Sequence, residues 1–275
     1  MIRKRFKPPY AAPAAVLGST TGVFYMIFIG LPLAALLISV AGRGDFLNSV
    51  SGDFALTALR LSLITSVISM VSVVLVGTPF AYLLARSRSA LLKLVDSLIE
   101  LPIVLPPVVA GVAMLMAFGR LGVVGPPLEA IGVVIPFTTV AVIFAQVFVA
   151  APFYVRAARI GFQSVGTEYE EMSQTLGMSP LRSFFRLTLP LAAPSILAGL
   201  GLAWARAFSE FGATMMFAGN LTGKTQTMPL AIMTAMESSL GEALVLSVLL
   251  LAGAIIILVG LGLVTRRPWT CLFYT

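Results

Sequence analysis

Histidine is absent from this chain of 275 residues, and its single cysteine is Cys271. These absences exclude a disulfide framework and the usual ligand sets of zinc, haem and iron–sulfur centres. They also remove the commonest general base, and the sequence contains no recognisable nucleophile–base pair. We therefore expect no catalytic site, no metal site and no cofactor bound by this chain, and we interpret Cys271 as an inert thiol in the tail.

Charge is also scarce. Only 11% of the residues are charged, 59% are hydrophobic, and the mean hydropathy is +1.02. Soluble domains carry roughly 25% charged residues, so the chain is predicted to be an integral membrane protein with little soluble mass. The net charge of +7 would suit a nucleic-acid partner, but the basic residues flank apolar segments, as membrane topology requires. We therefore expect no nucleic acid.

Six apolar segments account for most of the chain, and each has about the 20 residues that a helix needs to cross a bilayer. Continuous apolar runs favour helices, so the predicted fold class is all-α, a polytopic membrane protein with about six transmembrane helices. We place a tail at 1–19, a transmembrane domain at 20–264 and a second tail at 265–275. The predicted spans are 20–41, 57–85, 98–119, 133–160, 188–217 and 242–264.

The lysines and arginines predict the orientation, because cytoplasmic connections are enriched in them. The richer side would be cytoplasmic and would hold both termini. The first apolar run is long enough to span, so we expect an uncleaved first helix in the cytoplasmic (inner) membrane. The richer side holds the N-terminal cluster, Arg86, Arg88, Lys93, Arg156, Arg159, Arg182, Arg186, Arg266 and Arg267, and the other side holds Arg43, Arg60, Arg120, Arg206 and Lys224.

The third span contains three prolines within Leu101–Pro107, LPIVLPP. Proline lacks the backbone donor that a helix needs and bends or breaks it. Two interpretations stay open: a broken or re-entrant helix, which is tolerated where it is buried or lines a cavity, and an ordinary kink packed against its neighbours.

A polar island, Glu168–Pro190, lies between two spans on the predicted cytoplasmic side and reads EYEEMSQTLGMSPLRSFFRLTLP. Thr167 and Glu170 have the spacing of a capping box, in which a hydroxyl N-cap is paired with a glutamate three residues later. Glu168, Glu170 and Glu171 fall in the first turns, where the helix dipole favours acidic side chains. The pattern predicts that a helix begins here.

The rest of the island predicts a turn and a second helix. Tyr169, Met172 and Leu176 fall at i, i+3 and i+7 and form one apolar stripe. Gly177 supplies a left-handed stop, and Ser179-Pro180 restarts a helix with an N-cap and a proline at the first position. We predict a helix-turn-helix over 167–187, which either lies on the membrane surface or offers a docking surface to a partner.

The spacing of this island resembles the EAA loop in the permease subunits of ATP-binding-cassette (ABC) importers. That family's pattern is E-A-A, three residues, glycine, nine residues, then I-x-L-P. Here Glu171 is followed by Gly177 and, nine residues later, by Leu187-Thr-Leu-Pro190. Met172 and Ser173 replace the two alanines and Leu187 replaces isoleucine, whereas the glycine and the proline match at full spacing.

The resemblance implies the ABC type I importer permease fold, with the island as a coupling helix seated in a groove of a cytoplasmic ATPase. It also implies two ATPase subunits that carry ATP and magnesium, a second permease copy in a homodimer, surrounding membrane lipid, and an extracytoplasmic oxyanion-binding protein. The coupling residues expected on this basis are Glu168, Tyr169, Glu170, Glu171, Met172, Leu176, Gly177 and Pro190.

Four further segments resemble the molybdate permeases of the molybdate–sulfate family. They are 101–111, 135–139, 203–214 and 217–230. Sulfate permeases share much of the Arg-x-x-x-Glu-Phe-Gly pattern at Arg206–Gly212, whereas Thr225–Leu230, TQTMPL, looks more like the molybdate branch. The resemblance implies molybdate or tungstate as cargo, with sulfate or thiosulfate as the alternative.

Arg206 and Glu210 are ionisable residues in or near the outer part of the fifth span, where such groups usually face a bundle interior or a water-filled cavity. Their i, i+4 spacing permits an ion pair. They form either a structural salt bridge or, with Gly212 and Thr214, part of a gate in which Arg206 meets an oxyanion.

The segment Gly219–Thr225, GNLTGKT, superficially resembles a P-loop. Only three residues separate its two glycines, whereas the P-loop motif needs four, and no strand precedes it, so a nucleotide site is rejected. Asn220, Lys224 and Thr225 are candidates for contact with an anion or a binding protein, and a plain surface turn is the alternative.

Two other classes of function compete with an ABC permease. A self-contained channel or secondary transporter predicts ionisable or broken-helix sites at mid-membrane in both halves of the chain, and we find no such matched pair. A membrane scaffold predicts no substrate-dependent ATPase activity at all.

Overall fold

The computed structural model describes residues 11–42 and 52–266, and in this part of the chain every regular element is a helix. Arg43, Arg267, Cys271 and the outer parts of both predicted tails, 1–10 and 267–275, lie outside the described residues. The elements are α1 (Ala11–Ala41), α3 (Asp53–Arg86), α4 (Ala90–Ile99), α5 (Leu101–Val104), α6 (Pro107–Phe118), α7 (Gly125–Ala130), α8 (Thr139–Ser164), α9 (Thr167–Thr175), α10 (Pro180–Ser183), a π-helical turn (Phe184–Thr188), α11 (Leu189–Phe208), α12 (Gly212–Ala218), α13 (Met228–Ser238) and α14 (Leu240–Arg266).

Five helices in the described residues are long and apolar enough to cross a membrane, and the bent pair α4–α6 supplies a sixth if it is counted as one span. The prediction of about six transmembrane helices is confirmed. Several boundaries differ from those predicted. The first helix begins at Ala11, inside the predicted tail, and α8 begins at Thr139 instead of 133. The late start of α8 follows from Pro136 and from Phe137, whose φ of 59° is not helical.

The predicted third span is broken at its prolines. Helices Ala90–Val104 and Pro107–Phe118 meet at a bend of 118°. Leu105 and Pro106 are both extended, with ψ of 132° and 134°, because a residue before proline is pushed out of the helical region. The broken-helix alternative is therefore confirmed, and the ordinary kink is wrong.

The predicted fifth span, 188–217, is not one helix. It consists of α11, which ends at Phe208, and α12, which begins at Gly212. At the break between them, the Glu210 carboxylate accepts a hydrogen bond from the Ala213 amide at 2.8 Å. That contact satisfies an amide in the first turn of a new helix. Apolar continuity does not reveal such a break.

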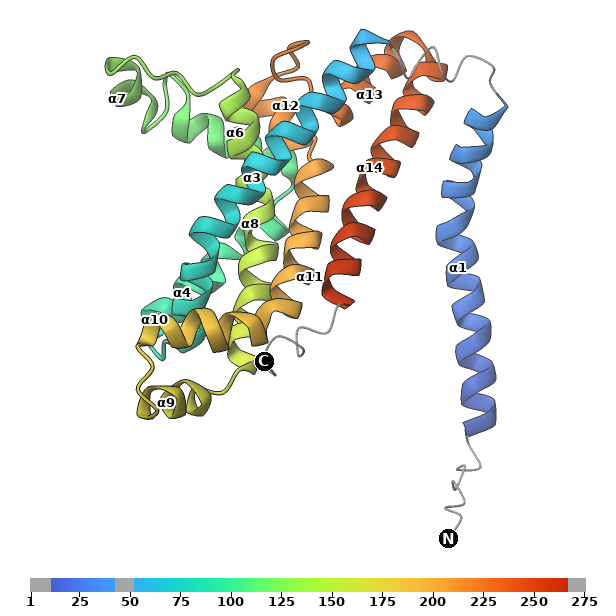
Figure 1. Ribbon diagram of the computed structural model, residues 1–275. Helices are drawn as coiled ribbons and strands as arrows, with labels where there is room; N and C mark the ends of the chain where they lie inside the picture. Colours follow the sequence, from blue (N-terminus) through green and yellow to red (C-terminus); the bar gives the residue numbers. More distant parts are fainter. Residues whose placement is uncertain (1–10, 43–51, 267–275) are drawn as a thin grey trace.

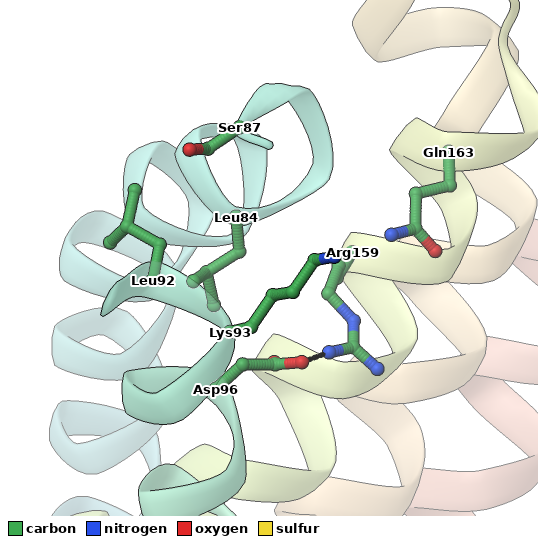
Figure 2. A pocket seen from close by; sticks show the side chains of 7 residues that line it. All are labelled: Leu84, Ser87, Leu92, Lys93, Asp96, Arg159 and Gln163. Atoms are coloured by element: carbon green, nitrogen blue, oxygen red, sulfur yellow. Dashed lines mark ion pairs between the residues drawn. The ribbon is translucent and has the colours of Figure 1, made fainter. Parts of the chain in front are cut away.

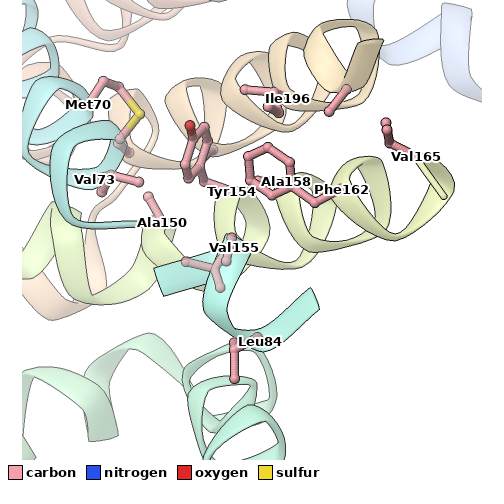
Figure 3. Packing of buried hydrophobic residues seen from close by; sticks show 14 residues of the cluster. Met70, Val73, Leu84, Ala150, Tyr154, Val155, Ala158, Phe162, Val165 and Ile196 are labelled. Atoms are coloured by element: carbon pink, nitrogen blue, oxygen red, sulfur yellow. The ribbon is translucent and has the colours of Figure 1, made fainter. Parts of the chain in front are cut away.

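Helices α3, α8 and α11 form the centre of the bundle, with α14 and then α1 to one side (Figure 1). Their shared core includes Met70, Ala150, Tyr154 and Phe162 (Figure 3). Glycines let the helices approach closely: a Cβ on Gly161 would lie 2.8 Å from the Ser195 Cβ of α11. In a membrane, where the hydrophobic effect does not drive helices together, small residues at such crossings favour association because they permit close van der Waals packing.

A row of buried hydroxyls on α3 adds polar contacts between these three helices. Ser69 donates to the Gln146 side chain of α8 at 2.9 Å, and the Gln146 amide donates to Thr65 at 3.2 Å. The Trp204 indole of α11 donates to Ser66 at 3.1 Å. All of the hydroxyls involved are fully buried, so we refer to α3, α8 and α11 together as the central trio.

The bundle has two distinct ends. Figure 1 shows α9 and α10 at one end, here called the α9 end, and α6, α7, α12 and α13 at the other, here called the α12 end. A second buried cluster joins α6 and α12 to the first turns of α8, and a third joins α13 to the beginnings of α3 and α14.

Candidate functional site

The α9 end carries the predicted helix-turn-helix, and its turn is built around Gly177. This glycine has a φ of +89°, a conformation that side-chain-bearing residues rarely adopt. The Gly177 amide donates to the Gln174 carbonyl at 2.9 Å, and the Met178 amide donates to the Ser173 carbonyl at 3.0 Å. This is the arrangement of a Schellman stop, so the predicted left-handed turn is confirmed.

The second helix begins as predicted. Ser179 is the N-cap of α10, its side chain accepts from the Arg182 amide, and Pro180 is the first helical residue. The buried hydroxyls of Ser173 and Ser183 are 2.6 Å apart and join the two helices across the turn. Pro190 follows the π-helical turn, in the first turn of α11.

The predicted apolar stripe on α9 faces solvent. Tyr169, Met172 and Leu176 are 52%, 62% and 84% exposed. Leu181 and Phe185, from the following turns, are 73% and 61% exposed. Glu168 and Glu171 are also exposed. Tyr169, Met172 and Leu176 lie outside the candidate membrane spans, whereas Leu181 and Phe185 fall within the span Pro180–Phe208. An exposed apolar stripe that is rimmed by charge and lies outside the spans has the character of a protein-binding surface.

The opposite face of α9 is held by Glu170, and here the capping-box prediction is wrong. The N-cap is Gly166, and no side chain caps the helix. Glu170 instead accepts from Arg86 at 2.5 Å, from Thr188 at 2.7 Å and from Tyr82 at 2.9 Å. The Glu170 carboxylate binds these side chains instead of capping the helix, because a cation and two hydroxyls form a stronger set of hydrogen-bond donors than one backbone amide.

The donors around Glu170 keep it ionised. Burial alone would raise the pKa of this carboxyl, but hydrogen bonds from Arg86, Thr188 and Tyr82 outweigh it, so the pKa lies below the usual carboxyl value. The Arg86 and Glu170 side chains are only 16% and 12% exposed. We call Tyr82, Arg86, Glu170 and Thr188 the Glu170 clamp.

The clamp joins α9 to all three helices of the central trio. Arg86 is the last residue of α3 and also donates to the Phe162 carbonyl of α8 at 3.0 Å. Thr188 immediately precedes α11. The Tyr82 ring packs edge-on against Phe162, with centroids 5.5 Å apart. Helix α9 is therefore connected to the trio through side chains that are in direct contact.

Three members of the clamp were not predicted as site residues. Arg86 enters the sequence prediction only through the charge bias, Thr188 only as the variable position of the Leu187–Pro190 motif, and Tyr82 only as part of the second span. One signal was available: Arg86 lies at the membrane end of an apolar helix, where a cation needs a counter-ion or water. Its partner is 84 residues away in the chain, and sequence spacing does not reveal pairs of that separation.

At the α12 end, Arg206 and Glu210 form the predicted ion pair, with 2.9 Å between Nη2 and Oε2. The Arg206 side chain is 27% exposed, whereas that of Glu210 is fully buried. Because the other oxygen of Glu210 accepts from Ala213, this carboxylate ties the last turn of α11 to the first turn of α12.

Helices α6 and α12 touch at glycines, so their backbones lie close together. A Cβ on Gly111 would come within 2.7 Å of the Ala213 carbonyl oxygen, and one on Gly212 would come within 2.9 Å of the Pro107 Cβ. Thr214 is fully buried on α12, and its hydroxyl has no hydrogen-bond partner within the described structure. The two short half-helices therefore pack against each other with little side-chain bulk between them.

The loop 219–227 is closed by its own side chains. Thr225 is fully buried, and its hydroxyl accepts from the Leu221 amide at 2.9 Å and lies 3.2 Å from the Gly219 carbonyl. The Asn220 amide donates to Thr234 at 2.9 Å. Lys224 is exposed. In this conformation Thr225 shapes the loop, and of the three candidates only Lys224 is exposed.

Within the described ranges, no group of three or more Cys, Asp and Glu side chains is placed to hold a metal ion. The ionisable residues instead form ion pairs at the two ends of the bundle. At the α9 end Arg86 pairs with Glu170, and Arg159 pairs with Asp96 and lies 4.0 Å from Glu100; at the α12 end Arg206 pairs with Glu210.

Comparison with known proteins identifies the family. The model of the binding-protein-dependent transport system inner membrane component matches residues 77–267. The molybdenum transport system permease protein ModB of Mycobacterium tuberculosis is 42% identical over 243 residues, which is 88% of this chain and 91% of that protein. The sulfate transport system permease protein CysW of Synechococcus elongatus is 35% identical over 222 residues, which is 80% of this chain and 77% of that protein.

A solved structure shows the same fold. A chain in the crystal structure of a bacterial alginate ABC transporter, in complex with an alginate pentasaccharide-bound periplasmic protein, matches with a TM-score of 0.71. The match covers 94% of this chain and 95% of that chain at 18% identity. The family match includes both the α9 loop and the α11–α12 break. The protein is therefore a multi-pass membrane protein that belongs to the binding-protein-dependent transport system inner membrane components, the family of ABC importer permeases.

Proposed function

We propose that this chain is the permease subunit of an ABC importer that moves an oxyanion, molybdate or tungstate, across the cytoplasmic membrane. The observation that carries the proposal is the arrangement of α9. Its apolar face, Tyr169, Met172 and Leu176, is open to a partner, and its other face is bound to the membrane helices through Glu170. A helix so placed receives a force on one side and transmits it on the other.

In this proposal the α9 end and both termini are cytoplasmic, which agrees with the arginines at that end. Two copies of the permease form a homodimer, and each α9 docks on one of two ATPase subunits. Those subunits bind ATP and magnesium and carry out hydrolysis, so the permease itself has no catalytic site. An extracytoplasmic binding protein delivers the oxyanion at the α12 end, where Lys224 and Asn220 are candidate contacts.

Alternating access follows from the clamp. ATP-driven closure of the ATPases displaces α9. Because the Glu170 clamp holds α9 to α3, α8 and α11, these helices move with α9 instead of staying in place while α9 moves alone. The half-helices α6 and α12 then shift at the other end, where Gly111 and Gly212 let them slide in close contact. The proposed result is a change between inward-facing and outward-facing states.

Arg206 is proposed to line the route of the anion. Its guanidinium is partly exposed, whereas its partner Glu210 is buried and also holds the start of α12. A shift of α12 that draws Glu210 away would leave the Arg206 charge free to meet an oxyanion. Thr214, whose hydroxyl has no partner in this conformation, would gain one in the other.

The cargo assignment rests on similarity to the ModB permease, which exceeds the similarity to the sulfate permease CysW. Sulfate or thiosulfate is the alternative cargo. A self-contained secondary transporter or channel is the alternative mechanism, and the exposed face of α9 argues against it because such a protein has no ATPase to dock.

Uptake by the reconstituted importer tests both points. With the cognate ATPase and binding protein, molybdate uptake should require ATP, and excess tungstate should compete while excess sulfate should not. Equal competition by sulfate would move the cargo to the sulfate branch. Uptake that continues without the ATPase would refute the ABC mechanism.

A further inference from the structure

A second feature at the α9 end has no part in the proposed transport cycle. A cavity of about 260 Å³ lies between the end of α3, the beginning of α4 and the end of α8. It is separate from the exposed face of α9 and from the α6–α12 contact. Figure 2 shows the residues around it, which are Leu84, Ser87, Leu92, Lys93, Asp96, Arg159 and Gln163.

Four side chains in this cavity carry hydrogen-bond donors. Lys93 is exposed and, among the described residues, has no ion pair. The Nε of Arg159 is buried and has no hydrogen-bond partner there. The Ser87 oxygen accepts from the Ser89 amide at 3.1 Å, which leaves the hydroxyl proton to donate. The Gln163 amide supplies two more donors.

The only carboxylate in the lining, Asp96, is already neutralised. It is ion-paired with Arg159 (Figure 2). Glu100 lies just outside the cavity, 3.7 Å from Arg156 and 4.0 Å from Arg159. The three cations Lys93, Arg156 and Arg159 thus face two carboxylates, which leaves one positive charge, and that charge lies on Lys93. A cavity with spare donors and a spare positive charge is complementary to an anion.

We propose that this cavity binds a phosphate group. The volume accommodates one tetrahedral oxyanion with its water. A lysine supplies the point charge, and an arginine, a hydroxyl and an amide supply donors of the kind that phosphate oxygens accept. Two sources share this chemistry, the headgroup of an anionic lipid at the membrane surface and free phosphate. Basic pockets between membrane helices are typical lipid headgroup sites.

The position of the cavity gives the bound group a role. Ser87 directly follows Arg86 of the Glu170 clamp, and Arg159 is one turn before Phe162, whose carbonyl Arg86 contacts. A phosphate group held by Lys93, Ser87 and Arg159 would join the beginning of α4 to the ends of α3 and α8. It would therefore brace the helices on which α9 is seated. The inference uses the proposed orientation only to place the cavity at the inner leaflet.

Lys93→Gln tests the site in the full-length chain, and Arg88→Gln is the matched control. Arg88 is exposed in the α3–α4 connection, five residues before Lys93, carries the same charge and does not line the cavity. Wild type, Lys93→Gln and Arg88→Gln are reconstituted in nanodiscs of phosphatidylcholine with increasing phosphatidylglycerol, and the thermal unfolding midpoint is recorded. We expect phosphatidylglycerol to stabilise wild type and Arg88→Gln, and Lys93→Gln to need about fivefold more of it, because one charge near the surface contributes about that factor.

A parallel series replaces the anionic lipid by inorganic phosphate at constant ionic strength in phosphatidylcholine alone. Stabilisation that depends on Lys93 in the lipid series assigns the headgroup, and the same dependence in the phosphate series assigns free phosphate. Equal losses in Lys93→Gln and Arg88→Gln, or no response to either anion, would overturn the site. Molybdate uptake by the wild-type importer, measured separately, tests the proposed function and is independent of this result.

Discussion

Replacing Glu170 by glutamine keeps the size of the side chain but removes the charge that binds α9 to the central trio. In the native clamp, Arg86 donates a charged hydrogen bond to this carboxylate, and both side chains are largely buried. A hydrogen bond between charged groups contributes about 1.5–3 kcal/mol, against about 1 kcal/mol for a neutral one. Glutamine also turns an amide group toward a donor, so we expect the substitution to weaken the seating of α9 by about 2 kcal/mol.

A loss of that size raises the population of detached α9 about 30-fold. Hydrogen–deuterium exchange of the permease alone measures it, because amides of α9 exchange through local opening. Glu170→Gln should speed exchange in 167–176 and leave the central trio unchanged. Glu171→Gln is the control: it makes the same chemical change at the next residue, but Glu171 is exposed and has no place in the clamp.

The same pair of variants in the reconstituted importer connects local stability with transport. Glu170→Gln should lower molybdate uptake per ATP hydrolysed, because a loosely seated helix absorbs part of the displacement. If Glu170→Gln and Glu171→Gln exchange at the same rate in 167–176, the clamp does not hold α9. The mechanical account of coupling would then be wrong.

Three further predictions follow from other features. Gly177→Asp should uncouple ATP hydrolysis from uptake while the protein still inserts into the membrane, because a side chain at a φ of +89° strains the turn by about 1 kcal/mol. Unchanged ATP-driven uptake would be evidence that the turn is not part of the docking surface. Gly111→Val should abolish uptake and lower the thermal unfolding midpoint, since a Cβ there would lie 2.7 Å from the Ala213 carbonyl oxygen and overpacking costs about 1–3 kcal/mol. The control is Gly22→Val, which should change neither quantity because a Cβ there has no neighbour within 4 Å. Because the pKa of Glu170 is lowered, its stabilisation of α9 is complete above the usual carboxyl value of 4.5 and is lost as the pH falls through the lower folded value. The hydrogen-exchange rate of α9, corrected for its intrinsic pH dependence, should therefore stay constant from pH 7 to 5. A loss of protection already at pH 6 would contradict the clamp.

Much of the fold could be predicted because membrane helices are recognisable in a sequence by the length and hydropathy of their apolar segments. The broken third span was visible in Pro106 and Pro107, which have a direct effect on the backbone. The break between α11 and α12 was not visible, since Ala203–Phe217 is mostly apolar and contains no proline. The contact of Glu210 with the Ala213 amide at the break is seen only in the folded chain.

The candidate site divides in the same way. The Gly177 turn and the exposed stripe of α9 are local features, and the sequence pattern predicts both correctly. Glu170 was assigned to α9 correctly but with the wrong partner. A glutamate three residues after a threonine satisfies the capping rule, yet in the folded chain the donors of Arg86 and Thr188 compete for it and prevail. Competition of that kind depends on distant elements.

Helix α8 reaches from one functional end of the molecule to the other. Its 26 residues are about 39 Å long, its last turns contact Arg86, and Phe137, two residues before its first, donates to the Phe217 carbonyl at the end of α12. Although Pro152 lies inside it, a helix of that length amplifies small rotations at its end. A tilt of about 5° pivoted at the α9 end would carry the far end by roughly 3 Å, which is comparable to the 2.7 Å that would separate a Cβ on Gly111 of α6 from the Ala213 carbonyl oxygen of α12. Ångström-scale adjustments at the α9 end would therefore be enough to change contacts at the α12 end.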